Sequence, residues 1–399
     1  MRILMLSPYV PWQVHGGGAI RIFNLLRELV RRGHQIVLFA GEGNRDLSAD
    51  HRYDLLCEEL HTYRLPAAGR LRSALLSMFS FLPYGAAKLH VGELRRTFPR
   101  RLQGERFDVI WVNVLYLAGV LPPELTAGTR VVLDESESDE LVWRGYSQRG
   151  SWPERLFAQL NLRKVKRFEK RILPGLDAVL CVSEVEAARM RGRVARGTEV
   201  WTVPNGVDLD FFRCIPLSQR SANCILLGGI MNIRRNIDAA IWFTQRIFPR
   251  IRASIPEAEL WVVGASPSRE VRQLQDVPGV HVTGTVKDTR DYFAKASVLV
   301  APYRFGAGTR LKMLEGMATG TPIVSTRAGC QGIEVVDGLH LLVSDEETEF
   351  ADRVIELLRD RKLAERLAAA SRALVEEKYC WEKIVGSLEP KLQDLAGRD

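Results

Sequence analysis

Two series of short apolar runs, separated by segments with helical periodicity, divide the chain. Each run has the length of a β-strand, and few runs alternate apolar with polar residues. Continuous apolar strands are typical of parallel sheets that are covered on both faces. The pattern therefore predicts α/β architecture, with strands at 2–7, 35–40, 107–114, 130–136 and 177–183 in the first series and at 223–229, 258–264, 279–284, 297–302 and 322–326 in the second.

The segments between the runs carry helix signals. Ile20, Phe23 and Leu26 recur at helical spacing until Gly33, and further helices are expected at 162–172, 236–252 and 310–319. Polar or small residues follow several predicted strands. Those strand ends are where open α/β sheets carry their sites.

The turn-rich sequence "VPNGVDLDFF" separates the two series. A chain of 399 residues with 46% hydrophobic residues is long enough for two domains, each with its own core. We expect two doubly wound Rossmann-like domains facing a cleft. The predicted boundaries are 1–205 for the first domain, 206–221 for a link, 222–378 for the second domain and 379–399 for a C-terminal helix that returns to the first domain.

The composition argues against a membrane-spanning protein, a secreted protein and a cysteine-based metal site. No apolar run approaches the ~20 residues of a membrane span, and "MRILMLSPYV" is broken too early by Pro8 to be a signal peptide. The six cysteines are far apart and show no metal-binding spacing, which predicts reduced thiols. A cytoplasmic protein is expected.

The formal net charge of +8 favours an anionic partner. Basic residues gather in 70–102 and 162–172. Two interpretations stay open: a solvated helix face packed on a core, or a surface that lies on anionic lipid at the inner face of the cytoplasmic membrane. Nucleic acid is not expected, because no helix-turn-helix, zinc-finger or RNA-binding signature accompanies the charge.

The candidate chemistry centres on "FGAGTRLKMLEGMATGTPIVST", residues 305–326. Gly306 and Gly308 permit positive φ and a close approach of the backbone to a ligand. Thr309 is the expected N-cap of a helix over 310–319. The unpaired N–H groups of a helix N-terminus bind phosphate, and Arg310 and Lys312 would strengthen that field.

Glu315 is expected to bind a ribose. It lies six residues past Thr309, or about 9 Å along a helix axis, which is about the distance from a diphosphate to the ribose of one nucleotide. A carboxylate there accepts hydrogen bonds from ribose hydroxyls. The alternative is a capped helix with a solvated Glu315.

Two other nucleotide motifs fit less well. A dehydrogenase fingerprint would need a third glycine where Leu311 stands, and a Walker A loop would need G-K-[ST]. Glu42 follows the second predicted strand, so a dinucleotide site stays open as an alternative.

With these motifs, and with "LLGGIMNIRRNIDAAIWF" at 226–243, the chain resembles a retaining glycosyltransferase of family 4 with the GT-B fold. The similarity covers nearly the whole chain. The G-A-G-T-R-L-K variant resembles sugar transferases of bacterial exopolysaccharide and cell-surface glycan biosynthesis. The resemblance implies transfer of a sugar from a nucleoside-diphosphate sugar to a glycan acceptor, expected to be lipid-linked, with retention of configuration.

The resemblance assigns the donor site residue by residue. Glu315 matches the second acid of the family's E-x7-E motif, and Ala307 stands where the first acid should be. Sugar recognition would then rest on groups elsewhere or on backbone groups of the loop comprising Gly306, Ala307, Gly308, Thr309, Arg310 and Leu311. Arg235 takes the position of the phosphate-binding lysine, with Arg234 beside it; the alternative is two solvated arginines before a helix.

In the first half, Gly16 and Gly17 match the glycine loop that approaches the donor, with a merely structural turn as the alternative. The family often carries a histidine at the end of one strand, where this chain has Asp134 and Glu135. Asp134 is expected either to contact the acceptor or sugar as a catalytic residue or to cap the next helix. His15 is more typical of a loop residue than of a base.

The implied mechanism develops negative charge on the leaving diphosphate. The helix N-terminus at Thr309, the loop N–H groups and Arg235 would stabilise that charge. No metal and no cofactor beyond the donor are expected. Two alternatives remain: a nucleotide-sugar epimerase using Asp134 and Glu135, and an inactive nucleotide-binding homologue, suggested by Ala307 and the missing histidine.

Overall fold

The chain divides into two compact units. A computed structural model describes residues 1–13, 16–42, 56–64, 70–89, 91, 94–96, 98, 104–122, 128–136, 138–149, 151–306 and 308–398. The first unit comprises Met1–Pro204 with Ile384–Asp399, and the second comprises Asn205–Lys383. The segment expected to be a link, 206–221, groups with the second unit, where the amide of Val207 donates to the carbonyl of Tyr379 (2.8 Å).

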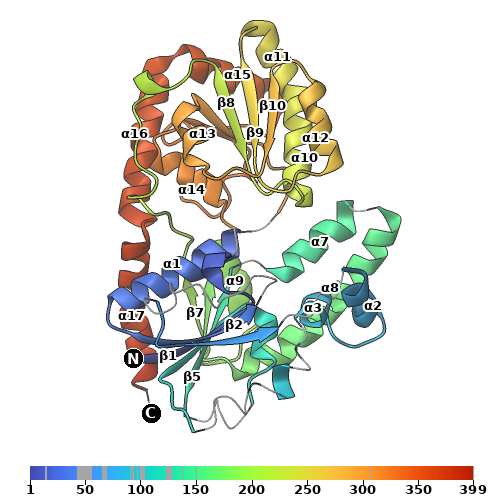
Figure 1. The fold of residues 1–399 in the computed structure, drawn as a ribbon, viewed down its shortest axis with the longest axis vertical. Helices are drawn as coiled ribbons and strands as arrows, with labels where there is room; N and C mark the ends of the chain where they lie inside the picture. Colours follow the sequence, from blue (N-terminus) through green and yellow to red (C-terminus); the bar gives the residue numbers. More distant parts are fainter. Residues whose placement is uncertain are drawn as a thin grey trace. The chain divides into compact units, whose positions relative to one another are not determined.

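A parallel sheet of seven strands forms the centre of the first unit (Figure 1). Its strand order is β3-β2-β1-β4-β5-β6-β7, and each neighbouring pair is parallel. The strands are β1 Arg2–Ser7, β2 Gln35–Glu42, β3 Glu59–Arg64, β4 Val109–Asn113, β5 Arg130–Glu135, β6 Ala178–Cys181 and β7 Glu199–Thr202.

Helices connect these strands. The α-helices of this part of the chain are α1 Gly17–Arg31, α2 Arg70–Met78, α3 Tyr84–Lys88, α5 Leu115–Ala118, α7 Asp139–Arg149, α8 Trp152–Ile172 and α9 Glu184–Arg191. Short 3-10 turns lie at Pro11–Gln13 and Leu173–Gly175.

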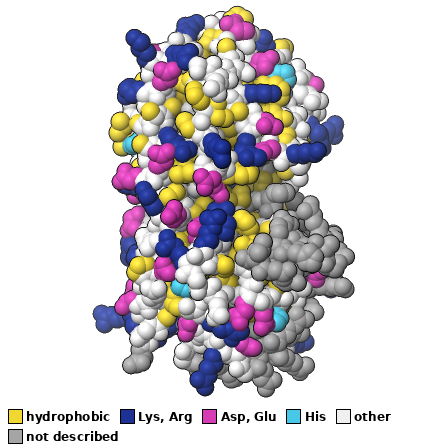
Figure 2. All heavy atoms as spheres, turned by 60° about the vertical axis from the view of Figure 1, so that its left-hand side comes forward, with side chains coloured by type: hydrophobic (Ala, Val, Ile, Leu, Met, Phe, Trp, Pro, Cys, Tyr) yellow, Lys and Arg dark blue, Asp and Glu magenta, His cyan; other side chains and the backbone are white. Residues whose placement is uncertain are grey.

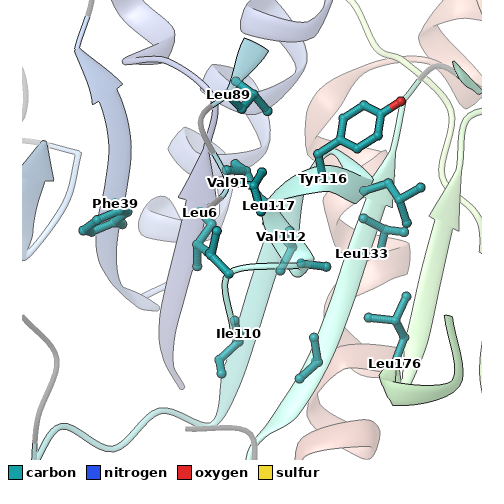
Figure 3. Packing of buried hydrophobic residues seen from close by; sticks show 14 of the residues in the cluster. Leu6, Phe39, Leu89, Val91, Ile110, Val112, Tyr116, Leu117, Leu133 and Leu176 are labelled. Carbon is teal, nitrogen blue, oxygen red and sulfur yellow. The ribbon is translucent and has the colours of Figure 1, made fainter. Parts of the chain in front are cut away.

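Both faces of this sheet are buried. Leu6, Ile110, Val112 and Leu133 pack on one face together with Tyr116 of α5, as Figure 3 shows. The residues that alternate with them point to the other face and are equally buried, among them Met5, Trp111 and Val132. Two covered faces explain why these strands are continuous apolar runs.

The second unit contains a six-stranded parallel sheet of order β10-β9-β8-β11-β12-β13. Its strands are β8 Cys224–Gly228, β9 Glu259–Val263, β10 Val280–Gly284, β11 Val298–Ala301, β12 Ile323–Ser325 and β13 Leu342–Val343. The α-helices are α10 Arg234–Trp242, α11 Phe248–Ser254, α12 Arg269–Arg272, α13 Arg290–Lys295, α14 Leu311–Ala318, α15 Glu347–Arg359 and α16 Arg361–Lys378.

Separate apolar clusters cover the two faces of this second sheet. Ile225 and Leu227 of β8 pack with residues of α10, α11 and α15, whereas Leu226 packs with residues of α13, α14 and α16. The second unit is therefore a doubly wound layer structure, as the apolar runs predict. The fold class expected from the sequence is confirmed for both units.

All ten predicted strands are present, and three others were not predicted. Strands β3, β7 and β13 are short or lie at the edge of their sheets. The helix expected over 236–252 begins earlier, at Arg234, and continues through a π-helical turn at Phe243–Ile247 into α11. Pro249 lies just after this turn, where a proline cannot donate the usual helical hydrogen bond.

The last helix, α17, spans Trp381–Ala396. From Ile384 onward it groups with the first unit. There Glu389 accepts from Arg32 (2.9 Å) and contacts the ring of His34 (3.0 Å). These contacts fix the C-terminal segment to α1 and the turn that follows it.

Basic and acidic side chains are interspersed on the face shown in Figure 2, so the positive net charge is not concentrated in one field there. Among the described residues, no helix is both long and apolar enough to cross a bilayer. Within the same residues, no group of three or more His, Cys, Asp or Glu side chains is arranged to hold a metal ion. The six cysteines are free.

Candidate functional site

The second sheet changes direction at β8. Strands β9 and β10 follow on one side of β8, and β11, β12 and β13 follow on the other. The loops after β8 and β11 therefore diverge at the carboxyl end of the sheet. In open α/β sheets, ligands bind in the crevice at this kind of switch point.

The loop after β8 is held close to the end of β9. The amide of Gly229 donates to the carbonyl of Val263 (3.0 Å), and that of Met231 donates to Ala265 (2.8 Å). A Cβ built on Gly264 would lie 1.5 Å from the carbonyl oxygen of Gly229, so only glycine fits there. Gly264 is not among the site residues predicted from the sequence, although a glycine directly after a predicted strand was a visible signal.

This loop leads into the N-terminus of α10, which carries Arg234 and Arg235. Ile233 is the N-cap, and no acidic residue lies in the first turn. Arg234 is exposed and Arg235 is half-buried. The N-terminus therefore combines the positive end of the helix dipole with two cations, an arrangement that attracts anions.

The loop after β11 approaches Arg235. Gly306 and Gly308 have φ of 122° and 81°, which confirms the predicted positive φ values. A Cβ built on Gly306 would lie 2.5 Å from Nη2 of Arg310 and 3.0 Å from Cδ of Arg235. The glycine loop and Arg235 thus meet at the switch point, while Ala307 lies outside the described residues.

The expected N-cap is wrong by one residue. Helix α14 begins at Leu311, with Arg310 as an N-cap that makes no side-chain capping bond. Thr309 is buried, and Arg310 has an extended backbone, so the helix begins after it. The later start places Glu315 about 7.5 Å along the helix axis from the N-cap.

Arg310 and Tyr303 pack together at the start of this helix. The guanidinium carbon of Arg310 lies 5.0 Å from the ring centroid of Tyr303, and the hydroxyl of Tyr303 donates to the carbonyl of Gly228 (3.2 Å). Burial raises the pKa of Tyr303, while nearby Arg310 and Arg235 lower it and Glu315 raises it. The phenol therefore stays neutral and links the ends of β8 and β11. Tyr303 is not among the site residues predicted from the sequence.

Lys312 and Glu315 form an ion pair on α14. Nζ of Lys312 lies 2.5 Å from Oε2 of Glu315, whose side chain is 6% exposed. The Lys312 methylenes lie against Gly228, 3.4 to 3.9 Å from where its Cβ would stand. Arg235 and Arg310 are two further cations at this end of the sheet. The predicted roles in phosphate and ribose binding stay predictions.

In the first unit, the predicted glycine loop leads into α1. Gly16 is the N-cap and Gly17 the first residue of this helix, with no acidic residue in the first turn. Gly17 is exposed. A Cβ on Gly18, the second residue of α1, would lie 2.5 Å from the hydroxyl of Tyr9, so a larger residue there would displace the end of that side chain. His15 lies outside the described residues.

Asp134 is paired inside the first unit. Its oxygens accept from Nε of Arg21 at 3.0 and 2.9 Å, and Nη2 of Arg21 lies 2.9 Å from Oδ1. The side chains of Arg21 and Asp134 are 0% and 1% exposed. Asp134 does not cap the next helix, because α7 begins at Asp139. Its catalytic role stays a prediction.

The backbone after β4 is strained. Val114 has φ of 77°, which is a genuine outlier for a β-branched residue. Strain of this kind costs about 1–3 kcal/mol and clusters at functional sites. Val114 lies at the carboxyl end of β4, beside β1, where the strand order of the first sheet reverses. Nothing in the sequence indicated it.

Glu135 lies beside Asp134 in a buried group of acids and arginines. Its carboxylate is 3.4 Å from Nη2 of Arg189. Burial raises the pKa of Glu135 to about 8; Arg189 opposes the rise, and the carboxylates of Glu169, Asp139 and Glu186 add to it. Glu135 therefore holds a proton near neutral pH.

We expect Glu135→Gln to stabilise the protein increasingly as pH rises. Between the ordinary pKa and about 8, the unfolded chain releases a proton that the folded protein keeps, so wild-type stability falls with rising pH. That loss reaches about 1.4 kcal/mol per pH unit, and the glutamine variant lacks it. Urea unfolding of both proteins at pH 5 and pH 8 measures the difference.

Glu140→Gln is the matched control. Burial opposes ionisation of Glu140, but Arg193, Arg189 and Lys166 lower its pKa overall. Removing this carboxylate is expected to cost stability at both pH values. A difference between Glu135→Gln and the wild type that is the same at pH 5 and pH 8 would contradict the account of Glu135.

Comparison with known protein families covers most of the chain. Residues 15–211 match the family model described as Glycosyltransferase Family 4. Residues 223–360 match the model described as Glycosyl transferases group 1. The second match contains the loops after β8 and β11 together with α10 and α14.

Two similar sequences and one solved structure extend this finding. A Klebsiella pneumoniae protein named "Uncharacterized 44.6 kDa protein in cps region" is 21% identical over 97% of this chain and 98% of its own. A GDP-mannose-dependent alpha-(1-6)-phosphatidylinositol monomannoside mannosyltransferase of Mycobacterium tuberculosis is 27% identical over 72% of this chain and 77% of its own. The sucrose-phosphate synthase of Thermosynechococcus elongatus shares the fold, with a TM-score of 0.74 and 19% identity over 99% of both chains.

Proposed function

The chain belongs to the family 4 glycosyltransferases with the GT-B fold, and we propose that it transfers a sugar from a nucleoside-diphosphate sugar to a lipid-linked glycan acceptor with retention of configuration. One observation carries the donor part of this proposal. At the switch point of the second sheet, Arg235 meets the Gly306 loop, and Glu315 lies one turn into the adjoining helix.

The donor diphosphate would lie between two helix N-termini. Neither α10 nor α14 has an acidic residue in its first turn, so their N–H groups and Arg235 present positive charge to the phosphates. Bond cleavage places negative charge on the leaving diphosphate. Fixed donors and cations stabilise that charge without reorganising.

Glu315 would accept hydrogen bonds from the ribose hydroxyls of the same nucleotide. Its Oε2 is paired with Lys312, which fixes the position of the carboxylate on α14. The sugar itself would be bound by backbone groups of residues 306–311. The proposed reaction uses no metal ion, because Arg235 and the helix N-termini supply the charge that a metal would otherwise provide.

The proposals for the acceptor and for the cellular location are based on the names of the relatives. The mycobacterial relative is named for a phosphatidylinositol monomannoside acceptor, and the Klebsiella relative is named for a cps region. We therefore place the reaction in cell-surface glycan assembly, at the inner face of the cytoplasmic membrane. The epimerase alternative draws no support from the family matches, both of which describe glycosyl transferases.

A transfer assay tests this proposal. Purified protein would be incubated with UDP-glucose, UDP-N-acetylglucosamine or GDP-mannose, each labelled in the sugar, and with a bacterial lipid extract in the presence of EDTA. We expect label to enter the lipid fraction with one donor, and NMR of the product to show the anomeric configuration of the donor. Inverted product, an epimerised nucleotide sugar, or no incorporation from any donor would each contradict the proposal.

A further inference from the structure

Large apolar side chains are exposed on two segments of the first unit. Among the described residues, thirteen such side chains are exposed, and eight of them lie between 75 and 81 or between 152 and 160. Phe81 is 92% exposed, Phe79 84% and Trp152 78%. Single exposed apolar residues need no explanation, but an exposed cluster marks an interaction site.

The two segments are fixed side by side. Nζ of Lys164 on α8 donates to the carbonyls of Ser77 and Ser80, the latter at 2.8 Å. Oδ1 of Asn161 accepts from the hydroxyl of Ser77 (3.2 Å) and from the amide of Tyr84 (2.8 Å). The turn that carries Phe79 and Phe81 is thereby held against α8, and Figure 1 shows α2, α3, α7 and α8 together at one side of the first sheet.

Helix α8 presents an apolar end and a basic end on the same face. At 100° per residue, the six exposed positions of this stripe fall within about 80° of arc. The opposite face of the helix is buried through Ala158, Val165 and Phe168. Along about 30 Å of helix the exposed stripe is Trp152, Leu156, Leu160, Arg163, Arg167 and Lys170.

The cations of this stripe are not used within the fold. Arg163, Arg167 and Lys170 form no ion pair among the residues that the structure describes, and neither does Arg72 on α2. Helix α8 holds seven basic and two acidic residues. An excess of unpaired cations beside exposed aromatic rings is complementary to an anionic surface with an apolar interior.

We propose that Phe79, Phe81, Trp152, Leu156 and Leu160, together with Arg163, Arg167 and Lys170, form a docking surface for a bilayer of anionic phospholipids. Aromatic rings bind at the boundary between headgroups and acyl chains, and cations are attracted to anionic headgroups. The order along α8 suits this arrangement, because the apolar end would enter the boundary while the basic end stays among the phosphates. The inference does not depend on sugar transfer, since a protein that fails to turn over would still bind vesicles.

Vesicle co-sedimentation tests the docking surface. The full chain would be mixed with vesicles of phosphatidylcholine alone or of phosphatidylcholine with phosphatidylglycerol. We expect binding mainly to the anionic vesicles, weakened by salt. Replacing all three basic residues of the stripe, Arg163→Gln, Arg167→Gln and Lys170→Gln, should weaken it roughly 100-fold, since each cation near an anionic surface contributes about a factor of five.

A second variant, Phe79→Ser with Phe81→Ser and Trp152→Ser, should weaken binding by at least roughly 10-fold to anionic vesicles. These side chains are mostly exposed, so the fold should persist, as circular dichroism would check. Matched controls are Val185→Ser, which is exposed elsewhere on the first unit, and Arg250→Gln with Lys287→Gln and Lys362→Gln on the second unit. Both controls should bind like the wild type.

Three results would overturn the proposal. The wild type could fail to bind anionic vesicles; both triple variants could bind like the wild type; or the controls could lose as much binding as the triple variants. A concentration-dependent dimer in light scattering, abolished by the serine variant and without vesicle binding, would assign the surface to a second copy of the chain instead.

Discussion

The Arg235→Ala substitution is expected to lower kcat/KM for the sugar donor by about 100- to 1000-fold, the usual effect of removing one fixed group that stabilises developing charge. Arg235 is half-buried at the N-terminus of α10, and its Cδ lies close to the Gly306 backbone. The side chain is not part of an apolar cluster, so the midpoint of thermal unfolding should change little. Initial rates at varied donor concentration, together with a melting curve, measure both effects.

A conservative variant and a control variant test this prediction further. Arg235→Lys should recover part of the activity, because it keeps the charge but loses the planar fork that holds two phosphate oxygens. Arg250→Ala, at an exposed arginine in the first turn of α11, should behave like the wild type. Equal rates for Arg235→Ala and Arg250→Ala would remove Arg235 from the donor site.

The second large effect is expected on stability, at the buried pair of Arg21 and Asp134. Removing either partner leaves an unpaired charge in the core, which typically costs about 3–5 kcal/mol. Arg21→Met and Asp134→Leu should each lower the free energy of unfolding by that amount. The double replacement should restore most of it, because an apolar pair of similar size needs no compensation. Urea unfolding of the wild type, the two single variants and the double variant completes this double-mutant cycle.

The same cycle addresses the catalytic prediction for Asp134. If this carboxylate contacts the sugar or the acceptor, the double replacement regains stability but not kcat. If Asp134 only neutralises Arg21, the double replacement regains both. If Arg21→Met or Asp134→Leu were as stable as the wild type, the claim that the two residues form a buried ion pair would be wrong.

The continuous apolar runs predicted ten of the thirteen strands formed by the described residues, because strands covered on both faces need apolar residues at every position. Strand β3, "ELHTYR", lies at the edge of its sheet and mixes polar and apolar residues. Strands β7 and β13 have only four and two residues. The mixed polar and apolar sequences of β3 and β7, and the two-residue length of β13, explain why the apolar runs did not predict these three strands.

Part of the candidate site was also visible in the sequence. Gly306 and Gly308 adopt the positive φ that a glycine loop suggested. The pair of Lys312 and Glu315 was visible in principle, as opposite charges three residues apart on a helix, but each residue was assigned separately to the ligand. Thr309 has the chemistry of an N-cap, yet its burial and the extended backbone at Arg310 move the helix start.

Sequence patterns did not predict the contacts between residues that are far apart in the chain. Arg21 and Asp134 are separated by 113 residues, and no local pattern connects them. Tyr303 follows β11 and Gly228 ends β8, and the pairing of these two strands follows only from the strand order. Sequence patterns predict elements and local backbone demands, whereas the partners of buried polar groups depend on how the elements pack.

Nucleotide binding by the wild type and Arg235→Ala shows whether a nucleoside diphosphate binds at the switch point of the second sheet. Thermal stabilisation would be recorded with UDP, GDP, ADP, dTDP and NAD at equal concentration, since a ligand that binds only the folded state raises stability according to its affinity. We predict that one nucleoside diphosphate stabilises the wild type and that Arg235→Ala loses most of this shift. Stabilisation by NAD alone, or by no nucleotide, would contradict a nucleoside-diphosphate site at the switch point of the second sheet.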